Sequence, residues 1–139
     1  HDFPRYSFDT IILDVPCSSS GTVRKSPKLI DTWKLSVSEG YAERQMDLIL
    51  RAFDRLNPGG TMVYSTCSIA PEEDENVIDF LLRNRPAEVV PVALPNFHFS
   101  PGLTSWQGRD YDPQVARCGR VWPHHNNTDG FFVAKVVRC

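Results

Sequence analysis

Two cysteines stand where the residue pattern changes from strand-like to loop-like. Cys17 lies in the segment Asp14–Gly21 (DVPCSSSG), and Cys67 lies in the segment Tyr64–Ser68 (YSTCS). Each follows an apolar, β-branched run and precedes a helical pattern. Because ligands of open α/β sheets bind at the carboxyl ends of strands, these positions predict one site that contains both sulfurs. A thiolate in such a site is a nucleophile.

The surroundings of Cys17 leave several interpretations open. A free cysteine after a strand is often only a small buried residue. The serine-rich loop behind Cys17 offers backbone donors and small side chains beside an acid, Asp14, which by itself could equally be a capping or salt-bridging residue. A phosphatase loop is excluded, because the spacing from Cys17 to Arg24 is one residue too long and the preceding histidine is missing.

Cys67 precedes a predicted helix that starts near Pro71, a residue favoured at the first helical position. The positive end of the helix dipole lowers the pKa of a nearby thiol and favours the thiolate, although a structural cysteine remains the alternative. The acidic run Glu72–Glu75 suits the same helix end. We expect it to form a solvent-exposed first turn and a poor surface for RNA.

The elements that would position these residues alternate between strands and helices. A capping box at Ser36–Glu39 predicts the start of a helix with an apolar stripe, which Asn57–Gly60 ends. The helix after Pro71 ends before Pro86. Residues 94–121 are predicted to form a long loop, and a loop of that length often passes around a functional site. Strands are predicted at 8–13, 61–65, 88–92 and 131–137, which gives an α/β fold whose last strand follows a loop and inserts antiparallel.

Composition indicates one soluble globular domain. The chain has 139 residues, of which 41% are hydrophobic and 23% charged, and a net charge of −2 from 15 basic and 17 acidic residues. That balance does not indicate nucleic-acid binding, although Arg24, Lys25, Lys28 and Lys34 gather locally. No apolar stretch is long enough to span a membrane, and residues 1–5 lack the apolar core of a signal peptide.

Cysteine usage and the missing initiator methionine add two expectations. The four cysteines contain no CxxC pair, so we expect reduced thiols in the cytoplasm and no metal site. Without an initiator methionine the chain is expected to be a fragment. His124 and His125 are expected to form a polar turn into the last strand. Four aromatic residues could either stack on bases or pack in the core: Phe97, Phe99, Trp106 and Trp122.

Three segments together resemble the motifs of one enzyme family. Asp14–Gly21 resembles the fourth motif of the RNA cytosine-5 methyltransferases (the Sun/Fmu and NOL1/NOP2/Sun family), with Val15 and Ser19 in place of the usual alanine and glycine. Tyr64–Ser68, with the acidic stretch that follows it, is similar to the sixth motif. The segment Trp122–Lys135 is similar to the C-terminal motif.

Further likeness lies in the predicted loop, where Ser100–Thr104 and Arg109 are similar to archaeal members of the family. The resemblance implies a class I, Rossmann-like methyltransferase fold that uses S-adenosylmethionine, with a mostly parallel sheet and an antiparallel last strand. Residues 1–139 would then be the C-terminal part of the catalytic domain. The glycine-rich cofactor loop is expected upstream of His1, so this part alone should bind the cofactor poorly.

The resemblance also implies residue roles. Cys67 would be the nucleophile that adds to C6 of cytosine, and Cys17 would assist release of the product. Asp14 would contact the base as an acid and border the cofactor. The alternative makes Cys17 the nucleophile, as in DNA cytosine-5 enzymes that use a Pro-Cys motif.

The implied partner is RNA, with tRNA favoured over rRNA, and no membrane or metal. Arg24, Lys25, Lys28 and His124 are the residues expected to contact it. Two other hypotheses stay open: a non-catalytic RNA-binding remnant of the same fold, and a thiol redox protein with a Cys17–Cys67 disulfide.

Overall fold

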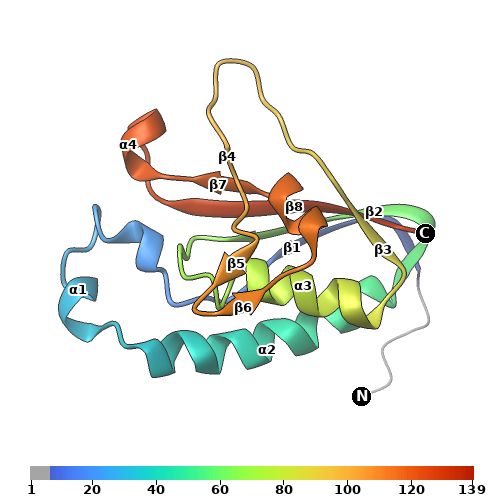
Figure 1. Ribbon diagram of the computed structural model, residues 1–139, viewed down its shortest axis with the longest axis horizontal. Coiled ribbons are helices and arrows are strands. Elements are labelled where there is room, and N and C mark those ends of the chain that lie inside the picture. The colour runs from blue at the N-terminus through green and yellow to red at the C-terminus, as the bar shows by residue number, and fades with distance from the viewer. Residues whose placement is uncertain (1–6) are drawn as a thin grey trace.

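A computed structural model describes residues 7–139, and the stretch 1–5 in which no signal peptide is expected lies outside them. Its largest element is a six-stranded sheet (Figure 1). The sheet contains β1 (Phe8–Asp14), β2 (Leu56–Thr66), β3 (Ala87–Val90), β4 (Ser100–Pro101), β7 (Gly119–Val121) and β8 (Phe131–Arg138). The other elements are the hairpin of β5 (Ser105–Trp106) and β6 (Arg109–Asp110) and the helices α1 (Leu29–Thr32), α2 (Leu35–Phe53), α3 (Glu75–Asn84) and α4 (Pro123–Asn126).

The strands are ordered β1-β2-β8-β7-β4, and β3 pairs with the end of β8 that β7 does not reach. β1 and β2 are parallel, whereas β8 is antiparallel to β2, β3 and β7. β1, β2, β3 and β7 therefore point one way, and β4 and β8 the other. The predicted α/β fold with an antiparallel last strand is confirmed. The segment between β7 and β8 is too short for a parallel crossover, which needs a dozen or more residues.

The core lies between the sheet and two helices. Figure 1 shows α2 and α3 on the same side of the sheet. Because side chains alternate along a strand, every second residue of β2 and β8 faces these helices, whereas Ile12 on the other face of β1 is 78% exposed. The fully buried apolar side chains of this layer are Met62, Tyr64, Phe132, Ala134 and Val136 from the sheet and Ile49, Phe53, Val77, Ile78 and Leu81 from the helices.

Helix α2 starts one residue before the predicted capping box, so that prediction was wrong. Lys34 is its N-cap residue, with an extended backbone and no side-chain cap hydrogen bond. Ser38, inside the predicted box, is instead fully buried. Its hydroxyl accepts from Trp33 Nε1 at 3.0 Å and donates to Glu73 at 2.8 Å. The Ser38 hydroxyl thus bonds to a partner distant in sequence and takes no part in the start of the helix.

The predicted turn Asn57–Gly60 lies inside β2 rather than at the end of the helix, since α2 already ends at Phe53. Phe8 pairs with Leu56 and Thr10 with Thr61, so the intervening residues of β2 form a bulge. Gly59 within it has a φ of 79°, a conformation that glycine adopts without a steric penalty.

Two other boundaries differ from the prediction. Helix α3 begins at Glu75 rather than Pro71, because hydrogen-bonded turns come first: Glu73 N donates to the Ala70 carbonyl oxygen at 3.0 Å. The expected loop 94–121 contains β4 to β7 and a short 3-10 helix, Pro113–Arg117. The expected turn at His124 and His125 is the short helix α4.

A buried charge cluster joins β7 to α3. Arg120 donates to both carboxylate oxygens of Glu75 and, at 3.0 Å, to the Ile69 carbonyl oxygen. Asp74 Oδ2 lies 3.5 Å from Arg120 Nη2. All three charged side chains are at most 1% exposed. Removing one partner of such a cluster leaves a buried charge without compensation.

We therefore expect Arg120→Leu to lower the free energy of unfolding by about 3–5 kcal/mol, because Glu75 and Asp74 lose their cation. Urea denaturation followed by circular dichroism measures this change. The matched control is Arg51→Leu, which removes an exposed arginine paired with Asp47 on α2 and should leave stability nearly unchanged. Equal effects of the two substitutions would contradict the prediction.

Candidate active site

The parallel pairing of β1 and β2 brings the two cysteine loops together. Asp14 and Ser65 are partners at the ends of these strands, and Val15 N donates to the Ser65 carbonyl oxygen at 3.2 Å. Cys17 Sγ lies 3.1 Å from Cys67 Sγ, and both side chains are half-buried. The prediction of one site with two sulfurs is confirmed. Both cysteines are free thiols, so the disulfide of the redox hypothesis is not formed.

The two thiols differ in acidity. The pKa of Cys67 is lowered from 9.0 to about 6, chiefly because the Cys17 thiol hydrogen-bonds to it, while partial burial opposes the shift. The same hydrogen bond, together with burial, raises the pKa of Cys17. A smaller contribution against ionisation of Cys67 comes from the negative charge of Asp14. The hydrogen bond between the two sulfurs therefore favours ionisation of Cys67 over ionisation of Cys17.

Ser19 also acts on the pair. Cys67 Sγ donates to the Ser19 hydroxyl oxygen at 3.4 Å, and the contact with Ser19 contributes to the lowered pKa of Cys67. Ser19 has a φ of 59°, in the left-handed region that favours glycine. The usual glycine of the motif fits that backbone without strain, whereas the serine of this chain adds a hydroxyl to the site.

Asp14 is exposed at the end of β1, where its Oδ1 accepts a hydrogen bond from Ser65 Oγ at 3.1 Å. Its carboxylate forms no ion pair with any residue of the part that the structure describes, so the salt-bridge interpretation is not supported. The structure thus places Asp14 beside the two thiols with its charge open to solvent.

The acidic run after β2 is not the solvent-exposed turn that the sequence suggested, and that prediction was wrong. Glu73, Asp74 and Glu75 are fully buried, and only Glu72 is partly exposed. Glu73 accepts from Ser18 N at 2.7 Å, Ser18 Oγ at 2.6 Å and Ser68 Oγ at 2.7 Å. Burial is possible because hydroxyl, amide and guanidinium donors from other elements satisfy the carboxylates. No local signal in the sequence identifies these partners.

Gly21 joins the three motif segments at one point. Its amide donates to the Cys67 carbonyl oxygen at 2.9 Å, and its carbonyl oxygen accepts from Gly130 N at 2.8 Å. A Cβ at position 21 would lie 2.4 Å from the Gly130 carbonyl oxygen and 2.5 Å from that of Cys67. Only glycine permits this approach, so the segment before β8 is fixed against both cysteine loops.

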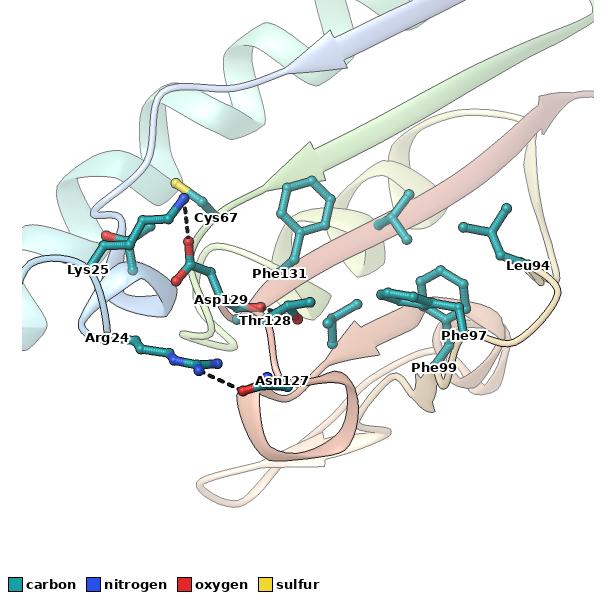
Figure 2. Close-up of a pocket in the computed structure, with 14 residues that line it drawn as sticks. Arg24, Lys25, Cys67, Leu94, Phe97, Phe99, Asn127, Thr128, Asp129 and Phe131 are labelled. Atoms are coloured by element: carbon teal, nitrogen blue, oxygen red, sulfur yellow. Dashed lines mark hydrogen bonds and ion pairs between the residues drawn. The ribbon is translucent and has the colours of Figure 1, made fainter.

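A pocket of about 950 Å³ opens beside Cys67. Figure 2 shows Cys67, Arg24 and Lys25 on one side of it and Phe97 and Phe99 on the other. Arg24 Nη2 donates to Asn127 Oδ1 at 2.6 Å, and Lys25 forms a 2.9 Å ion pair with Asp129. The lining comprises Thr22, Arg24, Lys25, Cys67, Leu94, Phe97, Phe99, Val121, Asn127, Thr128, Asp129, Gly130, Phe131 and Val133.

The structure brings some predicted contact residues to this pocket and not others. Arg24 and Lys25 line it, whereas Lys28 and His124 are exposed and lie outside its lining. Phe131, 37% exposed, belongs to the lining but was not a candidate. Its position directly after Gly130, at the start of a strand, was the available signal. Trp106 and Trp122 line a second pocket of about 570 Å³ instead.

Two further properties of residues 7–139 concern partners. No group of three or more histidine, cysteine, aspartate or glutamate side chains there has a geometry that could hold a metal ion. None of the helices in that range is long and apolar enough to cross a membrane.

Two solved structures share the fold over nearly the whole chain. A methyltransferase homologue from Pyrococcus horikoshii has a TM-score of 0.81 at 33% identity, covering 96% of this chain and 40% of that one. NSun6 from the same organism, determined with SFG, an analogue of S-adenosylmethionine, has a TM-score of 0.77 at 32% identity, covering 96% and 30%. The chain therefore has the Rossmann-like fold of the methyltransferases.

The profile of the family described as 16S rRNA methyltransferase RsmB/F matches residues 2–137, and the chain belongs to that family. The tRNA (cytosine(49)-C(5))-methyltransferase of Pyrococcus abyssi is 41% identical over 96% of this chain and 43% of its own length. The 28S rRNA (cytosine-C(5))-methyltransferase of Mus musculus is 37% identical over 98% of this chain and 18% of its own length. The resemblance inferred from the motifs is confirmed, and the chain spans less than half of these relatives.

The role of Ser19 can be tested by Ser19→Gly. The pKa of Cys67 should rise from about 6 toward its ordinary value, because the side-chain contact with Ser19 that lowers this pKa is removed. The measurement is the pH dependence of Cys67 alkylation by iodoacetamide, read by peptide mass mapping. Ser26→Gly, at an exposed position outside the site, is the control and should leave the midpoint in place. An unchanged midpoint in Ser19→Gly would show that its hydroxyl does not act on Cys67.

Proposed function

We propose that this chain is the C-terminal part of the catalytic domain of an S-adenosylmethionine-dependent enzyme that forms 5-methylcytosine in RNA. The observation that carries the proposal is the thiol pair, in which Cys67 Sγ lies 3.1 Å from Cys17 Sγ and has the lowered pKa, beside a pocket with basic and aromatic residues. Similarity to cytosine-C5 methyltransferases of tRNA and rRNA supports the substrate class. We favour tRNA over rRNA as the substrate. The proposed location of the enzyme is the cytoplasm.

Cys67 is proposed as the nucleophile. Its sulfur adds to C6 of a cytosine that has left its stack, and the electron pair of the C5–C6 double bond moves toward C5 and N3. C5 is then nucleophilic enough to accept a methyl group. The pocket beside Cys67 has aromatic side chains, Phe97, Phe99 and Phe131, against which a base or its neighbours could stack.

Cys17 is proposed to assist product release, and the thiol pair explains how its acidity changes during the reaction. The first cause of its raised pKa is the hydrogen bond to Cys67. Once Cys67 is bound to C6 as a thioether, that negatively charged acceptor is gone and the pKa of Cys17 falls. Cys17 can then lose its own proton to solvent and, as a thiolate, take the C5 proton. The C5–H electron pair re-forms the C5–C6 double bond, and the S–C6 bond breaks with its electron pair returning to Cys67 sulfur.

Asp14 is proposed to lie between the base and the cofactor. S-adenosylmethionine, when bound, supplies the methyl group. One described residue suits the part of this cofactor that carries the methyl group. Asp14 offers an exposed carboxylate at the carboxyl end of β1, where ligands of open α/β sheets bind. The same carboxylate can hydrogen-bond the N3 side of cytosine when it carries a proton, which stabilises the charge that addition creates.

The RNA contacts are proposed to centre on Arg24 and Lys25 at the pocket edge, because they lie beside Cys67. Lys28 and His124 are outside this pocket and would contact more distant phosphates. Screening by salt should therefore affect RNA binding more than the reaction of the thiols.

The division of roles between the thiols is tested in the full-length protein with labelled S-adenosylmethionine and tRNA. Cys67→Ala should abolish methyl transfer, because no sulfur can add to C6. Cys17→Ala should accumulate a covalent protein–RNA adduct, visible as a shifted band after denaturing electrophoresis. Activity in Cys67→Ala, together with loss of activity without adduct in Cys17→Ala, would reverse the roles. Tight RNA binding without methyl transfer would favour the non-catalytic hypothesis.

The lowered pKa of Cys67 predicts the acid limb of the pH profile. Because the thiolate is the reacting form, kcat/KM should be constant above about pH 6 and fall as the pH drops below it. Initial rates of the full-length enzyme from about pH 5 to about pH 9 would measure this limb, because that range includes both the expected value and the ordinary thiol pKa. A limb near the ordinary thiol pKa would contradict the assignment of Cys67 as a pre-formed thiolate.

A further inference from the structure

Glu73 connects both cysteine loops through one buried carboxylate. Its side chain is fully buried, and none of the ion pairs among residues 7–139 includes it. Five hydrogen-bond donors surround it instead. Oε1 accepts from Ser18 N at 2.7 Å and Gln45 Nε2 at 3.3 Å; Oε2 accepts from the hydroxyls of Ser18, Ser38 and Ser68 at 2.6, 2.8 and 2.7 Å.

Two of these partners are direct neighbours of the thiols. Ser18 follows Cys17, and Ser68 follows Cys67. Ser18 is bound through both its amide and its hydroxyl, so its backbone is fixed as well as its side chain. The Ser68 hydroxyl is fixed by a second hydrogen bond, which it accepts from Ala70 N at 3.0 Å. One carboxylate therefore sets the relative position of the residues next to both sulfurs.

The backbone of Glu73 is anchored independently. Tyr64, a core residue of β2, donates its phenolic hydroxyl to the Glu73 carbonyl oxygen at 2.8 Å. The three hydroxyls lie at well-formed hydrogen-bond distances of 2.6–2.8 Å from Glu73 Oε2. An apolar residue could fill this space without the desolvation cost of a carboxylate, but it could not accept hydrogen bonds from the five donors.

We propose that Glu73 is a positioning residue, which holds Ser18 and Ser68 so that Cys17 stays within hydrogen-bond distance of Cys67 and Cys67 becomes the more reactive sulfur. The role of the thiols in methyl transfer rests on the proposed function, whereas the effect on thiol reactivity does not. Glu73 touches neither sulfur and would act through the two serines.

The test compares Glu73→Gln with the unaltered full-length protein by the pH dependence of Cys67 alkylation, followed by peptide mass mapping. The amide keeps the size of the side chain but replaces one acceptor oxygen with a donor, so it repels one of the present donors. The midpoint for Cys67 should rise from about 6 by about one pH unit or more. With RNA, kcat should fall about tenfold or more while KM changes little.

Ser68→Ala and Ser38→Ala form a matched pair that separates positioning from stability. Each removes one hydroxyl donor to the same oxygen of Glu73, at 2.7 and 2.8 Å. Ser68 is adjacent to Cys67, whereas Ser38 lies on α2. Only Ser68→Ala should raise the alkylation midpoint of Cys67, even if both variants lose similar amounts of stability. This pair also decides the question if Glu73→Gln does not fold.

These experiments distinguish failure of the positioning role of Glu73 from failure of the proposed function. A midpoint that stays near 6 in Glu73→Gln, or equal midpoints in Ser68→Ala and Ser38→Ala, would overturn the positioning role. A shifted midpoint in a protein that transfers no methyl group to any RNA would keep the positioning role and reject the enzyme. Glu72→Gln, which changes the adjacent, partly exposed acid, is the control and should leave the midpoint in place.

Discussion

The parallel pairing of β1 with β2 in one register is the constraint on which the site depends. Asp14 pairs with Ser65, and each strand leaves the sheet shortly afterwards into a cysteine loop. A slip of one residue would send each side chain to the opposite face of the sheet. Cys17 and Cys67, fifty positions apart in the chain, meet at 3.1 Å because that register holds.

A layer of buried acids lies on the interior side of the thiols and helps to hold the two cysteine loops in place. Glu73 is satisfied by hydroxyl and amide donors, while Asp74 accepts from Thr66 at 2.6 Å and lies near Arg120, which forms the bidentate pair with Glu75. Three consecutive carboxylates thus have three sets of partners from different elements. The basic residues at the pocket edge stay exposed, so the net charge of −2 does not describe the surface beside Cys67.

In the proposed reaction, the hydrogen bond between the two thiols affects both the attack by Cys67 and the later step at Cys17. The hydrogen bond that lowers the pKa of Cys67 also raises the pKa of Cys17, and it disappears when Cys67 becomes bound to carbon. Each sulfur is thereby prepared for its own step by the state of the other. Membership of the RsmB/F family agrees with a site of this kind, and the chain carries it in less than half the length of its relatives.

The sequence by itself determined β1, β3, the second half of β2 and the antiparallel β8, together with the two cysteine loops that follow β1 and β2, but it predicted a loop where β4 to β7 lie. These features follow from local apolar periodicity, turn residues and the short segment before β8, all of which act over a few positions. Only the tertiary structure decided that Glu73 is buried, that α2 starts without a capping box, and that Arg24 lines the pocket while Lys28 does not. Those outcomes depend on donors and surfaces contributed by segments far apart in the chain, whose meeting no local pattern encodes.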